Sequence, residues 1–341
     1  MGAVTIIIFW KQPMRIFHLT KIASLSAICA LGLGCNSTTK DEKRTRIVMI
    51  PKGTTHLFWK SVETGAKQAA KEHDIDLTFI GPQREDDRSQ QIDLVTNQAQ
   101  KNDAVVLAPL DRVALRGVAL QVAQMGKPVV IIDSSLADSD SFITSYIATD
   151  NREAGRMAAR KIAELLDGNG HVAMMRYLQG SASTEQREEG FLEEIKKHPS
   201  ISVVSSEQYA GATASQAQDT ATNLLTRFTR DGKLTIDGIF TSNQSSTYGM
   251  LQSLRAMSHA GNVKFIGFDG DASFIDAIKK KEMQGTLLQD PARMGYLGIK
   301  VAYAKLKGEP YEAIIDTGAT MLTLENLEQP DIADLIQSQV P

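Results

Sequence analysis

Short apolar runs alternate with segments of helical period from residue 46 onward. Within the runs of the first series the apolar residues are continuous, and amphipathic segments separate one run from the next. Continuous apolar runs of this kind are typical of parallel strands that helices cover on both faces. The series therefore predicts βαβ units, with strands at 47–50, 77–80, 104–107, 129–132 and 145–148 and helices at 59–73, 89–101 and 114–125.

A second series of the same kind begins with a helix over 152–166, which ends at the turn sequence Asp167-Gly168-Asn169-Gly170. A chain of 341 residues also exceeds the usual size of a single core. The expected fold is therefore α/β, with two doubly wound parallel-sheet lobes. The second series predicts strands at 171–175, 201–204, 236–240 and 263–268 and helices at 186–197, 215–228, 246–258 and 273–280.

Charge and composition exclude several classes of protein. The 37 basic and 40 acidic residues give a net charge of −3 without a long run of either sign, so nucleic acid and anionic membranes are poor partners. The six histidines are scattered, and no pair has the spacing of a metal site on a helix. No Walker loop or G-x-S-x-G motif is present. We expect neither a metal site nor a cofactor.

The N-terminal segment has the features of an export signal. Residues 22–34 carry no charge and directly follow Arg15 and Lys21. This stretch is shorter than the roughly 20 apolar residues of a membrane span, and polar and glycine residues interrupt it. Met14 suits the start of such a signal, so residues 1–13 read as a mis-assigned upstream extension.

The sequence Leu31-Gly32-Leu33-Gly34-Cys35 resembles a bacterial lipobox, although Gly32 stands where leucine is usual. This reading makes 1–35 a signal segment, Cys35 the site of lipidation and residues 36–45 a polar tether. The alternative is an ordinary signal in which Cys35 is incidental. Both cysteines, Cys29 and Cys35, lie in this region, so the body of the chain has no disulfide.

Polar residues directly follow many of the predicted strands. In open α/β sheets ligands bind beyond the carboxyl ends of the strands, so these residues are candidates for a site in a cleft between the lobes. The alternative for each is a role as a helix N-cap or turn residue. The residues are Lys52, Asp133, Ser134, Asp150, Asn243, Asp269 and Gln289.

Phe58, Trp59 and Arg187 add to this set. Carboxylates and amides each hold neighbouring hydroxyls, an arginine fork adds donors, and an aromatic ring covers the C–H face of a sugar. The chemistry suits a polyol, although packing in the core would also explain the pair Phe58-Trp59.

Several ordered motifs, spread over about residues 46–325, resemble the bacterial periplasmic sugar-binding proteins of the ribose-binding type, which are partners of ABC importers. The motifs are Phe58-Trp59 with Gly65-Ala66, Leu107-Ala108-Pro109-Leu110-Asp111, Pro128 to Asp133, Thr149-Asp150-Asn151, Arg187-Glu188-Glu189-Gly190-Phe191, Ser242-Asn243, Ile266 to Gly270 and Gln289-Asp290-Pro291.

The resemblance implies a type I periplasmic binding protein with three crossovers between its lobes. The first lobe would combine 46–149 with 290–317, and the second 150–289 with 318–341. It also implies that the ligand-binding residues are Phe58, Trp59, Asp133, Arg187, Asn243, Asp269 and Gln289.

The chain departs from the ribose-type pattern at several positions. Ser134 stands where arginine is usual, Ala108 where asparagine is usual, and Ala212 where a third aromatic is common. His56-Leu57-Phe58 replaces the usual Asn-Pro-Phe. We therefore expect a sugar or sugar-like ligand other than ribose, with Lys52, His56 and Ser134 as further candidate contacts.

The resulting hypothesis is a monomeric, exported lipoprotein in the periplasm or at the cell surface. It would be anchored at Cys35, capture a sugar by hinge closure and deliver it to an ABC permease without catalysis. One alternative is an extracytoplasmic sensor that presents its closed form to a membrane receptor. An enzyme acting on a small hydroxylated substrate is disfavoured because no nucleophile with a base, metal cluster or cofactor loop is recognisable. A transcription regulator is disfavoured because an export signal precedes the body.

Overall fold

The structure, a computed structural model, describes residues 44–339. The predicted export signal, the predicted lipidation at Cys35 and residues 36–43 of the predicted tether lie outside the described residues. Within the described range, no helix is both long and apolar enough to cross a bilayer.

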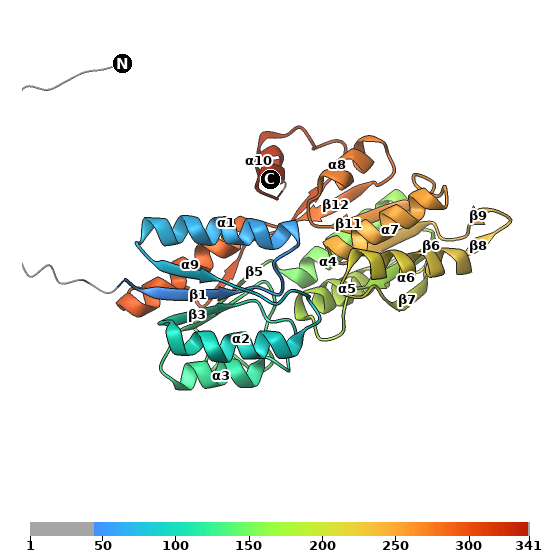
Figure 1. Cartoon of the computed structure of the whole chain (residues 1–341). Coiled ribbons are helices and arrows are strands. Elements are labelled where there is room, and N and C mark those ends of the chain that lie inside the picture. The colour runs from blue at the N-terminus through green and yellow to red at the C-terminus, as the bar shows by residue number, and fades with distance from the viewer. Residues whose placement is uncertain (1–43, 340–341) are drawn as a thin grey trace, which may run out of the picture. The chain divides into compact units, whose positions relative to one another are not determined.

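The first lobe is built on a parallel sheet of six strands in the order β13-β5-β4-β3-β1-β2. Figure 1 shows this sheet between α1 and α9 on one side and α2 and α3 on the other. Successive side chains point to opposite faces of the sheet. Ile47 and Met49 pack against α1 (Leu57–Glu72) and α9 (Pro291–Lys307), whereas Val48 and Ile50 pack against α2 (Arg88–Lys101) and α3 (Arg116–Gln124). The strands are β1 (Arg46–Ile50), β2 (Asp76–Phe79), β3 (Ala104–Leu107), β4 (Val129–Ile132), β5 (Ser145–Ala148) and β13 (Ile314–Asp316).

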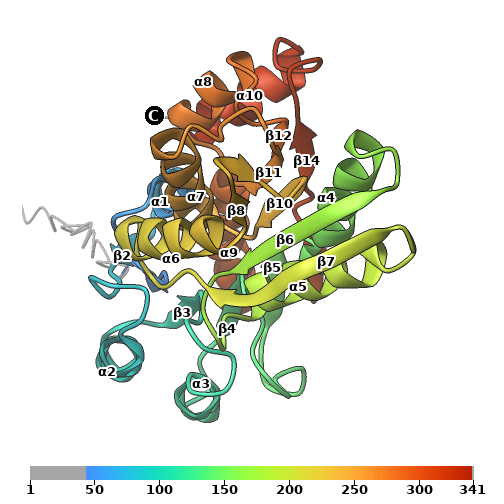
Figure 2. The same ribbon diagram turned by 90° about the vertical axis from the view of Figure 1, so that its right-hand side faces the viewer.

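The second lobe repeats this arrangement with the strand order β14-β12-β11-β10-β6-β7 (Figure 2). Only β14 is antiparallel, and it pairs with β12. One face packs against α4 (Asn151–Leu165) and α5 (Ala182–Ile195), the other against α6 (Ala214–Arg227), α7 (Gln244–Ala256) and α8 (Ala272–Lys279). The strands are β6 (Gly170–Arg176), β7 (Ile201–Tyr209), β10 (Gly238–Thr241), β11 (Lys264–Phe268), β12 (Gly285–Leu288) and β14 (Thr320–Leu322).

The expected α/β class with two doubly wound lobes is confirmed, and the predicted strands and helices are found with shifts at their ends. The largest shift is at β7, which extends to Tyr209 instead of ending at 204. Helix α5 begins at Ala182 rather than 186, so Arg187 lies in its second turn. The elements that were not predicted are the hairpin strands β8 (Thr229–Arg230) and β9 (Lys233–Leu234), helix α9, strands β13 and β14, and helix α10 (Pro330–Gln339).

The late elements divide between the two lobes. Met294 and Ile299 of α9 pack in the core of the first lobe, and β13 pairs with β5 of the first sheet. β14 then joins the second sheet, and Ile332 of α10 packs in the core of the second lobe. The chain thus leaves one sheet for the other after β5, after β12 and after β13. The residue limits of the lobes given by the resemblance remain a prediction.

Helices α4 and α5 cross at a distance that only glycine permits. A Cβ atom at Gly155 would lie 1.9 Å from the carbonyl oxygen of Arg187, and one at Gly190 would lie 2.0 Å from the carbonyl oxygen of Arg152. Because the two backbones touch directly, the position of Arg187 in the second lobe is set by the helix crossing.

Candidate functional site

Each lobe places one aspartate at the end of a central strand in the same unusual backbone conformation. Asp133 directly follows β4 with φ 61°, and Asp269 directly follows β11 with φ 70°. Aspartate adopts this left-handed conformation more readily than most residues. Both carboxylates are buried and line one cavity between the lobes.

This cavity and its mouth hold about 370 Å³ of space free of protein atoms. Of the eleven candidate residues proposed from the sequence, Ser134 and Asp150 do not line it. Residues from both lobes surround it. The predicted residues that line it are Lys52, His56, Phe58, Trp59, Asp133, Arg187, Asn243, Asp269 and Gln289.

Arg187, Gln289 and Asp269 form a chain of hydrogen bonds on the side of the second lobe. Nη2 of Arg187 donates to Oε1 of Gln289 at 2.9 Å, and Nε2 of Gln289 donates to Oδ1 of Asp269 at 2.6 Å. The guanidinium also lies 3.8 Å from the ring centre of Phe268. Burial lowers the pKa of Arg187 and raises the pKa of Asp269, while the attraction between the two groups opposes both shifts.

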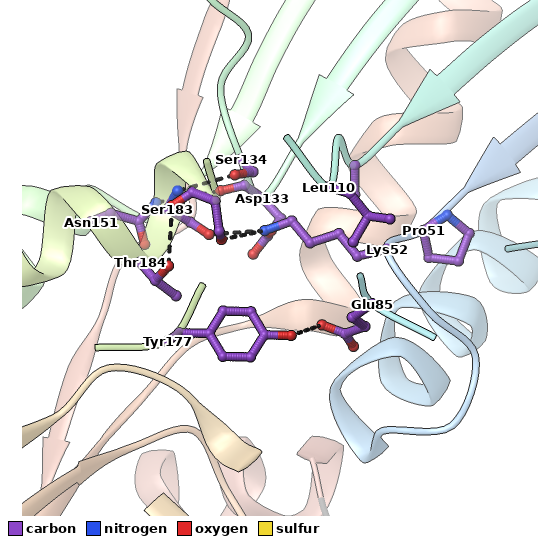
Figure 3. Close-up of polar contacts among 12 residues, drawn as sticks. Pro51, Lys52, Glu85, Leu110, Asp133, Ser134, Asn151, Tyr177, Ser183 and Thr184 are labelled. Atoms are coloured by element: carbon purple, nitrogen blue, oxygen red, sulfur yellow. Dashed lines mark hydrogen bonds and ion pairs between the residues drawn. The ribbon is translucent and has the colours of Figure 1, made fainter. Parts of the chain in front are cut away.

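Lys52 and Asp133 form a buried ion pair in the first lobe. Nζ of Lys52 lies 2.7 Å from Oδ2 of Asp133 and donates to Oγ of Ser183 at 3.0 Å (Figure 3). Lys52 follows β1 and Asp133 follows β4, so the pair joins the ends of two strands of one sheet. Since Ser183 belongs to α5, the ammonium group contacts both lobes.

Glu85 is the centre of a second polar cluster. Its Oε1 accepts from Nε1 of Trp59 at 2.6 Å and pairs with Nδ1 of His56 at 2.9 Å, and its Oε2 accepts from the hydroxyl of Tyr177 at 2.9 Å. Burial raises the pKa of Glu85, but His56, Trp59 and Lys52 outweigh burial and lower it to about 2. Burial lowers the pKa of His56, but Glu85 outweighs this effect and raises it.

Three of the predicted residues have clear structural roles. Asn243 is the N-cap of α7, where its side chain accepts from the backbone N–H of Ser246 at 3.2 Å, although it also lines the cavity. The rings of Phe58 and Trp59 pack edge to face with centroids 4.8 Å apart, and both side chains are buried. Both residues also line the cavity.

Ser134 does not lie where the sequence interpretation put it. It is fully buried, and its Oγ accepts from the backbone N–H of Ser183 at 3.0 Å. Asp150, another residue that follows a strand, is exposed and caps α4 by accepting from the N–H of Glu153. The N-cap alternative therefore holds for Asp150.

Six cavity-lining residues were not proposed from the sequence. Tyr177 directly follows β6, so the rule that located Asp269 would have found it had the strand end been assigned correctly. Glu85 stands in the charged sequence Arg84-Glu85-Asp86-Asp87-Arg88, which resembles an ordinary solvated loop. The six are Glu85, Tyr177, Ser181, Ser183, Thr184 and Gln244.

Charged groups of both signs surround the cavity. Lys52, Arg187 and His56 lie among the carboxylates of Glu85, Asp133 and Asp269. Among the described residues no group of histidine, cysteine or acidic side chains has the geometry of a metal site. The arrangement offers fixed donors and acceptors of hydrogen bonds, as an uncharged ligand rich in hydroxyl groups requires.

Comparisons with known proteins show the family of this chain. The sequence profile of the periplasmic binding protein domain matches residues 47–310. The ribose import binding protein of Haemophilus influenzae is 26% identical over 298 residues, which cover 87% of this chain and 97% of the relative. The xylitol-binding protein of Mycolicibacterium smegmatis is 24% identical and is covered over 82% of its length, against 85% of this chain.

Solved structures extend the similarity. A carbohydrate transporter solute-binding protein of Agrobacterium radiobacter, in complex with D-arabinose, is 34% identical with a TM-score of 0.81, over 86% of this chain and 99% of that one. An ABC transporter solute-binding protein of Agrobacterium vitis with bound D-fucose is 30% identical with a TM-score of 0.81, over 85% and 99%. The resemblance drawn from the sequence is confirmed: the chain belongs to the periplasmic binding protein family.

Proposed function

We propose that the cavity binds one neutral sugar of monosaccharide size, or a similar polyol, and that the nine predicted residues that line it are the ligand contacts. The protein is a sugar-binding component of an ABC sugar transport system, as the relatives named above indicate. The observation that carries the proposal is the pair of buried carboxylates, Asp133 and Asp269, that the two lobes direct into one cavity beside Trp59, where charged groups of both signs meet.

The ligand differs from ribose in this proposal. Lys52 and Glu85 add fixed charges to the cavity wall, and Ser134 is turned away from it. Relatives at 34% and 30% identity hold D-arabinose and D-fucose, whereas others are named for ribose, xylitol or D-allose. A sugar with a different arrangement of hydroxyl groups would form hydrogen bonds with Lys52 and Glu85. The protein would bind this sugar and would catalyse no reaction.

The proposal also covers the delivery of the sugar and the location of the protein. The protein acts outside the cytoplasmic membrane as a monomer and hands its sugar to the permease of the importer. The lipid at Cys35 holds it at the membrane. Support for these points comes from the family and from the sequence of residues 22–35.

A thermal-shift panel tests the function. The panel holds D-ribose, D-allose, D-arabinose, D-fucose, D-tagatose, xylitol and myo-inositol, with D-ribose 5-phosphate and D-galacturonate as charged controls. A true ligand at a hundred times its dissociation constant stabilises the folded protein by about 2.7 kcal/mol. We expect one or more neutral compounds to do so and the charged compounds to have no effect. Stabilisation by the charged compounds alone would refute the proposal.

A further inference from the structure

We propose that Glu85 and Tyr177 form a latch between the lobes, which holds the cleft shut and sets the rate at which a bound sugar is released. The statement about release rests on the proposed function, whereas the latch itself is a contact between protein groups. Glu85 is a positioning residue in this proposal, because it acts through its contacts with other side chains.

Glu85 is fixed within the first lobe before it meets the second. It follows β2 in the loop that leads to α2, and its side chain is buried. One oxygen is held by both Trp59 and His56, so the carboxylate cannot turn away without losing two charged hydrogen bonds. The other oxygen is thereby presented toward the second lobe.

Tyr177 is likewise held in place by contacts within its own lobe. It directly follows β6, and only 2% of it is exposed. Its backbone N–H donates to Oε1 of Glu188 at 3.0 Å, and the other oxygen of Glu188 accepts from Nη1 of Arg176 at 3.0 Å. The phenol therefore reaches Glu85 only when the lobes are together, as Figure 3 shows for the closed arrangement.

The segment that begins at Tyr177 makes further contacts with the first lobe. We call residues 177–183, which join β6 to α5, the latch segment. Besides a longer bond of 3.4 Å from Lys52 Nζ to Ser181 Oγ, four further hydrogen bonds join it to the first lobe, and none requires a ligand atom. They are Lys52 Nζ to Ser183 Oγ at 3.0 Å, Ser183 N to Ser134 Oγ at 3.0 Å, Arg112 N to Gly180 O at 2.9 Å and Arg88 Nη2 to Gln179 O at 2.8 Å.

The Glu85–Tyr177 bond joins a neutral hydroxyl to a buried carboxylate, and Tyr177→Phe removes it by deleting one oxygen atom. A hydrogen bond to a buried charged group contributes more than one between neutral groups, and opening the cleft replaces it only by bonds to water. Loss of the phenol should therefore shift the balance toward the open form by about tenfold. This latch would populate the closed form before any sugar arrives and delay its departure afterwards.

Two backbone amides report closure without a ligand. The N–H of Ser183 lies in the first turn of α5, where no helical carbonyl can accept it, so its bond to Ser134 protects it from exchange only while the cleft is shut. The N–H of Arg112 depends in the same way on Gly180. Hydrogen exchange of these two amides therefore measures opening.

The first experiment compares full-length wild type with Tyr177→Phe, in the absence of sugar, by hydrogen exchange with mass spectrometry. We expect exchange about tenfold faster in peptides containing Arg112 and Ser183, with β1 and β6 unchanged. Tyr209→Phe, which alters an exposed tyrosine of the same lobe, is the matched control. Unchanged protection at both amides would overturn the latch. Faster exchange throughout the second lobe would also overturn it, because Tyr177 would then support the fold instead of closure.

The second experiment measures release of the tightest-binding sugar of the panel by stopped flow, with Trp59 fluorescence as the signal. We expect Tyr177→Phe to raise the dissociation rate about tenfold, and to raise the association rate only as far as it raises the population of the open form before sugar arrives. In a Glu85→Gln background the same substitution should have a clearly smaller effect, since the charged acceptor is gone. An equal effect in both backgrounds, or a change confined to association, would contradict the proposal. Failure of every sugar to bind would count against the proposed function, while the exchange experiment would still decide on the latch.

Discussion

Asp269→Asn tests the proposed role of Asp269 in ligand binding while keeping a residue that tolerates the left-handed turn after β11. Asp269 has a left-handed φ of 70°, which asparagine tolerates and alanine does not, so Asp269→Ala would mix strain with loss of the carboxylate. Asparagine keeps the shape and removes the charge. Sugar hydroxyls that donate to this group would then meet a neutral acceptor.

The magnitude follows from the hydrogen bonds of the carboxylate. Bonds to a charged group contribute roughly 1.5–3 kcal/mol and neutral ones roughly 0.5–1.5 kcal/mol, so one sugar hydroxyl loses about 1.4 kcal/mol, or tenfold in affinity. Oδ1 and Oδ2 of Asp269 also accept from Gln289 at 2.6 Å and from the N–H of Gln244 at 2.9 Å. Asparagine supplies only one acceptor oxygen, so one of these bonds is lost.

The effect on stability has two parts of opposite sign. Burial raises the pKa of Asp269 despite the opposing influence of Arg187, so above the folded pKa the ionised carboxylate lowers stability, and this cost disappears as the pH falls through that pKa. Asparagine removes the same cost at every pH but loses a hydrogen bond to Gln289 or Gln244. We expect the unfolding temperature without sugar to change by less than about 4 °C.

Isothermal titration with the best sugar of the panel, together with a thermal scan without sugar, measures both quantities. Asp271→Asn is the matched control, because Asp271 caps α8 and asparagine caps a helix equally well. The expected result is a tenfold or greater loss of affinity for Asp269→Asn and little change for the control. If Asp269→Asn binds as tightly as wild type, Asp269 serves the turn after β11 and the site assignment is wrong.

Three further predictions concern other parts of the molecule. Gly155→Ala should destabilise the protein by about 1–3 kcal/mol in urea unfolding and weaken sugar binding, because it displaces Arg187. In the control Gly117→Ala, where a Cβ atom meets nothing within 4 Å, sugar binding should be unchanged and stability should be unchanged or slightly higher. Cys35→Ser should move the protein from the membrane to the soluble fraction, and an intact mass showing an unmodified Cys35 in wild type would contradict lipidation. The pKa of Glu85 is lowered to about 2 in the folded protein, so the ionised carboxylate stabilises the fold above pH 4.5, and this stabilisation is lost as the pH falls toward 2. The difference in unfolding free energy between wild type and Glu85→Gln, measured by urea unfolding, should therefore shrink by about 3 kcal/mol over that range.

Local pattern alone was sufficient for the central strands of both sheets and for one class of site residue. Continuous apolar runs such as residues 129–132 and 263–268 specify buried parallel strands, because a strand covered on both faces has no polar side. Residues that follow such strands, including Asp133 and Asp269, must lie at the edge where ligands bind. Both predictions rest on apolar runs that are adjacent in sequence to the residues they concern.

Elements whose partners are distant in sequence were missed. Strand β13 has three residues, of which Ile314 and Asp316 are exposed, and it exists because β5 offers an unpaired edge. Helix α5 was expected to begin at 186, yet contacts of Ser183 with Ser134 and Lys52 of the other lobe accompany its earlier start at Ala182. Tertiary contacts outweigh weak local preferences in such places.

Hydrophobic period and strand ends are local properties, so the α/β class, the two lobes and the chemical types that reach the cleft could be predicted from the order of the residues. The support that Ser134 gives to the backbone of Ser183, the burial of the Glu85 carboxylate and its bond with Tyr177 of the other lobe arise from the packing of distant segments. A glutamate in a charged loop is indistinguishable from a solvated one until the groups that desolvate it are known. Those groups, Trp59, His56 and Tyr177, lie between 26 and 92 residues away and come together only through the packing of the two lobes.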